Sequence, residues 1–218
     1  MKKLESSLKN MALALTGFSV VAGGLLGWVN DVTAEPIAQA NAKTLSDAIA
    51  VVVPGFDNNP AEAPDTVELN GAFYRIYKAT KSGEFIGAAV ESSSNGFGGT
   101  LTVLVGFDTE GNIIDYSLLS HAETPGLGSK AADWFKKGAK GDITGKNPGK
   151  SLLKVSKENG DIDAITASTI TSKAFLNAVN NAYAAYKNQH VDGASGATQQ
   201  EKPAEEAVSD TTNVEPVK

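Results

Sequence analysis

The stretch LTVLVGFDTEGNIIDYSLL, residues 101–119, carries the pattern that decides the fold. Two runs rich in β-branched and aromatic side chains, 101–107 and 113–119, flank the turn-forming residues 108–112. This pattern predicts two antiparallel strands joined by a hairpin turn. The chain is therefore expected to contain an antiparallel sheet.

The neighbouring residues extend this sheet. The runs 73–78 and 85–91 have strand composition and lie on either side of a Lys-Ser-Gly-Glu turn at 81–84. A meander of four antiparallel strands is the simplest assembly. The run 152–156 predicts a further strand, because it is followed by the turn-forming residues 158–161.

Helical periodicity flanks the predicted sheet. Apolar residues recur at helical spacing in 41–53, and a short helix is expected over 131–137. The strongest helical pattern covers 171–189. We expect an α+β fold with a single N-terminal transmembrane helix and one domain, in which helices flank an antiparallel sheet.

Composition limits the function. The 218 residues include 41% hydrophobic side chains, enough for one core of ordinary size. The net charge of -6 and the lack of clustered Lys and Arg argue against nucleic acid as a partner. With no cysteine, disulfides, thiol catalysis and cysteine-ligated clusters are excluded, so redox chemistry would need a bound cofactor. His121 and His190 have no neighbouring metal-ligand pattern, and no metal site is expected.

Residues 10–30 form an uncharged stretch about as long as a membrane-spanning helix. Lys2, Lys3 and Lys9 precede this stretch, so the positive-inside rule places the N-terminus in the cytoplasm. The domain would then lie on the periplasmic side of the bacterial inner membrane. A cleavable signal peptide is the alternative, since Val32-Thr33-Ala34 has suitable spacing.

The rest of the chain divides by composition. Residues beyond 190 include few large apolar side chains, so they are expected to form a disordered tail. The expected parts are a cytoplasmic N-terminus at 1–9, a transmembrane helix at 10–30, a linker at 31–40, a domain at 41–189 and the tail at 190–218.

The residues 161–172, DIDAITASTITS, lead into the strongest predicted helix. Thr169 or Thr171 is suited to cap this helix, which is the structural interpretation. A helix N-terminus also attracts phosphate through its unpaired N–H groups and the macrodipole. A phosphoester on Thr169 would therefore lie where its negative charge is stabilised.

Two motifs resemble those of the FMN-binding domain family. Residues 163–169, DAITAST, resemble the flavinylation motif D-x-x-[ST]-G-A-T, and residues 121–128, HAETPGLG, resemble the loop H-x-E-T-P-G-L-G. With the preceding membrane span, the order of the motifs is similar to the RnfG subunits of Rnf electron-transport complexes. It is less similar to the NqrC subunits of sodium-pumping NADH:quinone reductases.

The resemblance implies FMN joined through its phosphate to Thr169 by a flavin transferase that uses FAD as donor. The isoalloxazine ring would lie against the loop at 124–128, where glycines allow close backbone approach. No catalytic residue is implied, because the flavin supplies the redox chemistry. The residues expected to contact FMN are Thr166, Ser168, Thr169, Thr171, Glu123, Thr124, Gly126, Leu127, Gly128, Phe97 and Gly98.

The sequence departs from the flavinylation motif at two positions, because Ala167 and Ser168 stand where the family has Gly and Ala. The tail segment 192–198, DGASGAT, matches the motif fully. Thr198 lacks an apolar helix after it, whereas Thr169 has one, so Thr169 is the preferred site. A second flavin on Thr198 remains open.

The resemblance also implies a function. It is electron transfer within a membrane complex that couples ferredoxin and NAD to Na⁺ or H⁺ translocation, so the chain would act as one component of a translocating oxidoreductase. The partners would be the other membrane and peripheral subunits, the flavin transferase and the membrane. The alternatives are an NqrC-like protein that delivers electrons to quinone, and an exported binding module without cofactor.

Overall fold

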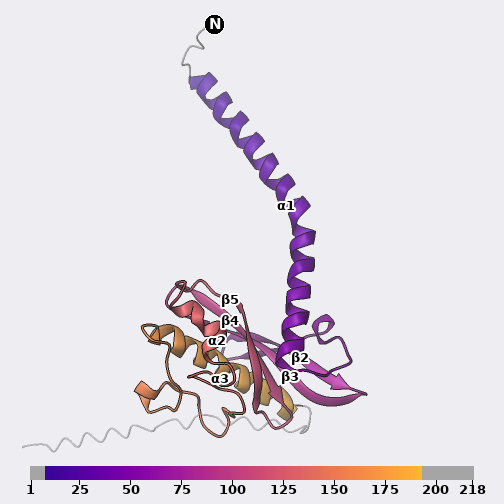
Figure 1. Ribbon diagram of the computed structural model, residues 1–218. Helices are drawn as coiled ribbons and strands as arrows, with labels where there is room; N and C mark the ends of the chain where they lie inside the picture. The colour runs from indigo at the N-terminus through magenta and orange to yellow at the C-terminus, as the bar shows by residue number, and fades with distance from the viewer. Residues whose placement is uncertain (1–7, 193–218) are drawn as a thin grey trace, which may run out of the picture.

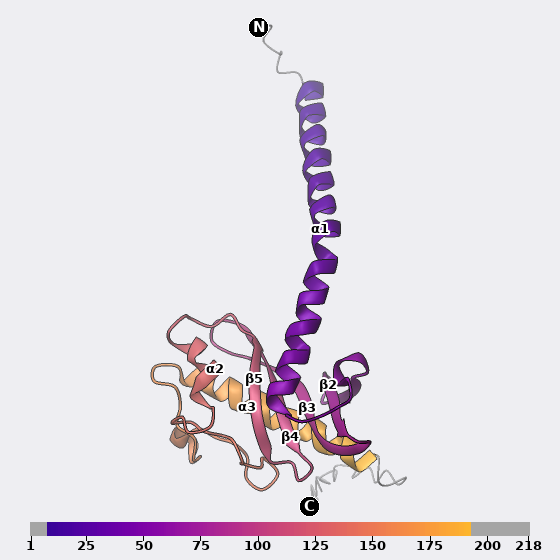
Figure 2. The same cartoon turned by 45° about the vertical axis from the view of Figure 1, so that its right-hand side comes forward.

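The computed structural model describes residues 8–192, which form one sheet with a helix on each face. The sheet contains five antiparallel strands in the order β1-β2-β3-β4-β5. The C-terminal end of helix α1 packs on one face, and helix α3 packs on the other (Figures 1 and 2). The predicted α+β class with an antiparallel sheet flanked by helices is confirmed.

The sheet is a meander, as predicted, but it has five strands instead of four. The strands are β1 Asp65–Leu69, β2 Ala72–Lys81, β3 Glu84–Asn95, β4 Thr100–Asp108 and β5 Ile113–Ser120. Sequence reasoning missed β1, a short edge strand with no fully buried residue. Its side chains have only one neighbouring strand to pack against, so its apolar pattern is weak.

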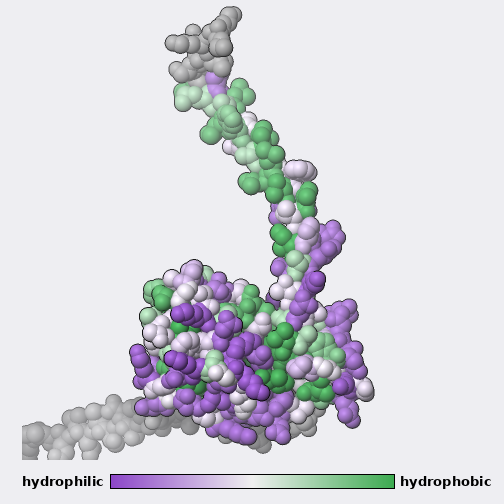
Figure 3. All heavy atoms as spheres, in the orientation of Figure 1, coloured by the Kyte–Doolittle hydropathy of each residue, from purple (hydrophilic) through white to green (hydrophobic). Residues whose placement is uncertain are grey.

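Helix α1 runs without a break from Leu8 to Val52. The predicted helices at 10–30 and 41–53 are therefore parts of one helix, which also includes the predicted linker at 31–40. Most residues of 31–40 are tolerated in a helix. Pro36 removes one backbone donor and its ring crowds the carbonyl of Val32, yet the helix continues through this position. The N-terminal part of α1 is long and apolar enough to cross a membrane (Figure 3).

The last turns of α1 belong to the domain. Ala48, Ile49 and Val52 are buried in a cluster with side chains from β2, β3 and β4. A Cβ atom at Gly106 would collide with the backbone carbonyl of Val52, so the helix end lies directly on β4. The C-terminal end of α1 and this face of the sheet therefore share one hydrophobic core.

We expect Ile49→Ala to lower the free energy of unfolding by about 2–5 kcal/mol, because it leaves a cavity under α1. Ile49 is fully buried, whereas Val51 on the opposite side of the helix is 55% exposed. Chemical denaturation of the detergent-solubilised protein measures the effect. Val51→Ala is the matched control and should change the stability by less than about 0.5 kcal/mol. Equal effects of the two substitutions would contradict the packing described.

Helix α3, Thr169–Asp192, covers the other face of the sheet. It begins two residues before the predicted start, so Thr169 belongs to its first turn. Phe175 stacks on Phe135 with 4.4 Å between ring centroids and meets Tyr116 edge-on at 4.7 Å. These aromatic contacts fix the first turns of α3 against β5 and the segment that follows it.

The segment between β5 and α3 is mostly irregular. Helix α2 covers only Ala131–Trp134, shorter than the predicted 131–137. The predicted strand at 152–156 is wrong, because only an isolated bridge joins Val155 to Ile162. A turn with Asn159 at a φ of 59° folds this segment back on itself. Lys154 and Ser156 therefore form hydrogen bonds with Ile162 instead of with a strand of the sheet.

Candidate functional site

Three segments meet at a pocket beside the start of α3. They are the loop between β3 and β4, the loop after β5, and the residues that lead into α3. The pocket has a volume of about 440 Å³. Its lining residues are Phe97, Glu123, Thr124, Leu127, Gly128, Ala167, Ser168, Thr169, Ile170 and Thr171.

Glu123 joins the three segments. Its side chain is buried, with 6% exposed. One carboxylate oxygen accepts hydrogen bonds from the backbone N–H groups of Phe97 at 2.8 Å and Gly98 at 3.3 Å. The other oxygen accepts a hydrogen bond from the Thr171 hydroxyl at 2.8 Å. Buried carboxylates are stable only when such donors replace water, so these three bonds hold the carboxylate in place.

A chain of hydroxyl groups continues from Glu123 toward the first turn of α3. The oxygens of Ser168 and Thr171 lie 2.9 Å apart, and both residues are buried. Because the Thr171 hydroxyl donates to Glu123, it accepts the hydrogen of Ser168. Ser172 supports the turn by donating to the Ser168 carbonyl at 2.9 Å. Ser168, which replaces the alanine of the flavinylation motif, therefore has a structural role here.

Two glycines let the loops close around Glu123. A Cβ atom at Gly128 would lie 2.5 Å from the Glu123 carboxylate and 2.8 Å from the Thr171 hydroxyl. A Cβ atom at Gly98 would collide with the Ala122 carbonyl. Gly98 packs against the backbone of the loop after β5, and Gly128 packs against the Glu123 and Thr171 side chains, so neither position leaves room for a Cβ atom.

Apolar side chains surround the opening of the pocket. Phe97, Leu127 and Ile170 are 70%, 41% and 55% exposed. The three side chains come from three different segments, yet all of them line the pocket. Exposed apolar groups gathered at a concave site are typical of ligand-binding pockets. The arrangement suits a flat, largely apolar ring system.

Thr169 lies at the edge of this pocket and is half-buried. As the first residue of a 24-residue helix, it lies where unpaired backbone N–H groups favour an anion. Thr166 is exposed and does not line this pocket. Of the hydroxyl-bearing residues in 163–169, Ser168 is hydrogen-bonded inside the protein, so Thr169 is the one best placed to carry a group that enters the pocket.

Ala167, two residues before Thr169, has a φ of 61°. This left-handed conformation is unfavourable for residues with a Cβ atom and costs roughly 1–2 kcal/mol. The family motif has glycine at this position, which adopts the conformation without strain. This chain therefore keeps the left-handed turn at position 167 although it has alanine there instead of glycine.

We expect Ala167→Gly to raise the free energy of unfolding by about 0.5–1 kcal/mol, because relief of the backbone strain exceeds the added entropy of the unfolded chain. Urea denaturation measures this change. Ala167→Val is the opposing variant and should be destabilising, because a β-branched residue tolerates positive φ less well than alanine. A loss of stability with glycine would contradict the strained turn.

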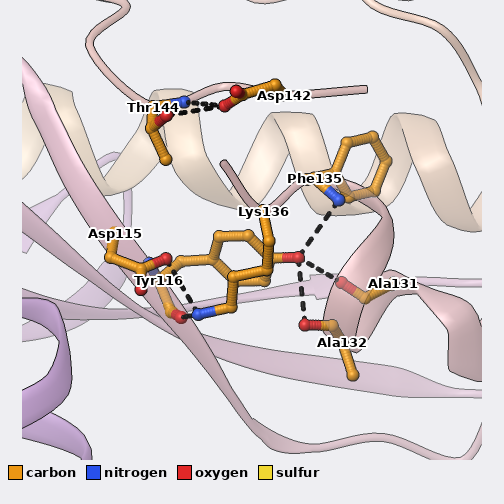
Figure 4. A network of polar contacts seen from close by, with 8 residues as sticks. All are labelled: Asp115, Tyr116, Ala131, Ala132, Phe135, Lys136, Asp142 and Thr144. Atoms are coloured by element: carbon orange, nitrogen blue, oxygen red, sulfur yellow. Dashed lines mark hydrogen bonds and ion pairs between the residues drawn. The ribbon is translucent and has the colours of Figure 1, made fainter. Parts of the chain in front are cut away.

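Tyr116 fixes the segment that follows the pocket loop (Figure 4). Its hydroxyl donates to the Ala131 carbonyl at 2.7 Å and accepts from the Phe135 N–H at 3.2 Å. Lys136 bonds to Asp115 at 2.8 Å and lies over the Tyr116 ring at 4.4 Å. Burial raises the pKa of the Tyr116 hydroxyl, which therefore stays protonated and keeps donating at neutral pH.

Most of the residues expected at the site lie together. Phe97, Glu123, Thr124, Leu127, Gly128, Ser168, Thr169 and Thr171 line the pocket, whereas Gly98, Gly126 and Thr166 do not. Ala167 and Ile170 line it although sequence reasoning did not name them as contacts. Ala167 lies inside the motif at 163–169 and Ile170 directly follows it, so closeness in sequence to Thr169 would have identified both. Thr198 lies outside the described residues. Within residues 8–192, no cluster of three or more His, Cys, Asp or Glu side chains is placed to bind a metal.

Comparison with known proteins agrees with this geometry. Residues 96–184 match the FMN-binding domain family, and this range includes all three segments of the pocket. The chain is 32% identical over 183 residues to the RnfG protein of the ion-translocating oxidoreductase complex from Cereibacter sphaeroides, covering 81% of this chain and 83% of that protein.

Other relatives carry the same name. The Yersinia pestis protein is 33% identical over 187 residues, covering 81% of this chain and 88% of its own length. The Shewanella piezotolerans protein is 32% identical, and the match covers 85% of this chain and 92% of that protein. A solved structure, the NqrC protein of a Na⁺-translocating NADH-quinone reductase from Parabacteroides distasonis, is 19% identical with a TM-score of 0.44, covering 68% of this chain and 91% of that chain.

Proposed function

The chain belongs to the RnfG family of ion-translocating oxidoreductase complexes, and from this premise we propose that it carries FMN as a phosphoester of Thr169 and relays electrons within such a complex. The observation that carries the proposal is the position of Thr169. Its hydroxyl-bearing side chain borders an apolar-rimmed pocket at the first turn of a long helix, inside the region that matches the FMN-binding domain family.

The pocket fits this cofactor. Phe97, Leu127 and Ile170 would cover the faces of the isoalloxazine ring and exclude water from it. The flavin, when bound, supplies the one- and two-electron chemistry. Glu123 uses both carboxylate oxygens in bonds to the protein, so we assign it to holding the two loops against α3.

Attachment requires FAD as donor and a separate flavin transferase. A bond forms between the Thr169 side-chain oxygen and the phosphorus of the FMN half. The pyrophosphate P–O bond breaks, AMP leaves, and the hydroxyl proton is released to solvent. The product is a phosphodiester with one negative charge, which the unpaired N–H groups of the first turn of α3 would stabilise.

The rest of the proposal concerns the complex. The positive-inside rule places residues 1–9 in the cytoplasm and the pocket on the periplasmic side of the bacterial inner membrane. The relay would connect a ferredoxin and NAD couple with other membrane subunits, and its turnover would be coupled to Na⁺ or H⁺ transport. A covalent link is useful there, because it prevents loss of the cofactor from the periplasm and keeps its local concentration high.

Intact-mass measurement tests the attachment. The full chain is produced together with a flavin transferase, purified from membranes and mapped by peptide mass spectrometry. We expect one FMN on the peptide that contains Thr169. A second FMN on the peptide that contains Thr198 would add the tail as a site. A protein with the mass of the bare polypeptide, from cells that flavinylate a known acceptor, would overturn the proposal.

A further inference from the structure

A second hollow also borders Thr169. It has a volume of about 370 Å³, and only Ala167 and Thr169 line both hollows. A group esterified to the Thr169 hydroxyl can therefore reach either one. The lining residues of the second hollow are Trp134, Lys140, Ser156, Lys157, Asp163, Ala164, Ile165, Thr166, Ala167 and Thr169.

The two hollows differ in charge. Glu123 is the only ionisable residue that lines the first, and it contributes negative charge. The second is lined by Lys140, Lys157 and Asp163, so its net charge is positive by one. Within residues 8–188, neither Lys140 nor Lys157 forms an ion pair with a carboxylate. Their charges are therefore available to an anion.

The wall of the second hollow is fixed by hydrogen bonds. The indole N–H of Trp134 donates to the Asp163 carbonyl at 2.8 Å, and the Ser156 hydroxyl donates to the Asp163 carboxylate at 3.1 Å. A Cβ atom at Gly141 would lie 2.8 Å from Trp134 and 2.9 Å from the Asp163 carbonyl, so the three segments are closely packed. The hollow is therefore defined by packed backbone and not only by flexible side chains.

We propose that this second hollow holds the phosphodiester end of the FMN on Thr169, with Lys140 and Lys157 as its counter-charges, while the flavin ring lies in the apolar pocket. This inference rests on the proposed function. The phosphodiester is negative, so the Glu123 carboxylate repels it from the first pocket and the two ammonium groups attract it to the second. Thr169 lines both hollows, so the apolar ring of FMN can lie in one hollow and its anionic phosphodiester in the other.

Phosphorus-31 NMR of the flavinylated full chain in detergent tests the proposal. The signal of the phosphodiester is measured in the native wild type and in the same protein unfolded by denaturant. We expect the signal of the Lys140→Gln/Lys157→Gln double variant to move from the native position toward the unfolded position. High salt should move the wild-type signal in the same direction, because it screens the ion pairs. The ratio of docked to free phosphodiester should fall by roughly two- to tenfold.

Two controls separate charge from folding. Lys137→Gln/Lys150→Gln removes the same charge from exposed lysines that do not line the hollow, and it should keep the wild-type signal. Lys140→Arg/Lys157→Arg keeps the charge and should also keep the signal. If the wild type carries FMN but the Lys140→Gln/Lys157→Gln variant gives the same phosphorus signal as the wild type, this inference is overturned and the proposed function stands. A wild type without FMN overturns the proposed function together with it.

Discussion

Thr169→Ala is expected to eliminate covalently bound FMN from the protein. The substitution removes the only side-chain atom at this position that can form a phosphoester, and no other hydroxyl of residues 163–169 both lines the pocket and is free of bonds inside the protein. The stability of the domain should change little, because the side chain is only half-buried. Intact mass and the flavin fluorescence of the denatured band on a gel measure the loss.

Thr166→Ala is the matched control for this experiment. Thr166 belongs to the same motif and also carries a hydroxyl, but it is exposed and lines only the second hollow, not the pocket of the ring. This variant should keep its FMN on the Thr169 peptide. FMN retained in the Thr169→Ala variant would assign the cofactor to another residue, and the peptide map would identify that residue.

Glu123→Ala is expected to lower the free energy of unfolding by about 3 kcal/mol. It leaves the Thr171 hydroxyl, which is buried, and the N–H groups of Phe97 and Gly98, which are partly buried, without their acceptor. The loop that carries Phe97 then loses its connection to α3, so flavin content should fall as well. Urea denaturation and the visible absorbance of the purified protein measure the two effects.

Two other variants test the assignment of Glu123. Glu123→Gln keeps the shape of the side chain but replaces one acceptor oxygen with a donor, so it should be destabilising by a smaller amount. Glu84→Ala removes an exposed carboxylate at the other end of β3 and should stay within about 0.5 kcal/mol of the wild type. Similar stabilities for the Glu84 and Glu123 alanine variants would show that the three hydrogen bonds contribute little.

The sequence predicted the elements that have strong internal patterns. β4 and β5 were evident from their β-branched and aromatic runs around a turn, and α3 from its apolar periodicity. β1 was missed, because an edge strand buries too little to require apolar alternation. At 152–156 a strand was predicted that does not exist, because these residues form only an isolated bridge between Val155 and Ile162.

Most residues of the predicted site line one pocket, but the hydrogen bonds among them could not be predicted. The motifs pointed to the loop after β5 and the start of α3, and these segments do meet. Glu123 was expected as a polar contact to the cofactor, whereas its oxygens are bonded to Phe97, Gly98 and Thr171. Hydrogen bonds between residues so distant in sequence cannot be recognised from one amino-acid sequence. The left-handed turn at Ala167 was equally hidden, because alanine itself does not favour it.

Because α1 continues without a break into the domain, the length of this helix sets both the height and the direction of the pocket. Every residue added between the bilayer and Leu45 would raise the domain by about 1.5 Å and rotate it by about 100° around the helix axis. One inserted residue would thus turn the pocket by about 100° around the helix axis with almost no change in height. Seven inserted residues, close to two full turns, would restore the direction while lifting the pocket by about 10 Å. The direction and the height of the pocket can therefore be varied separately.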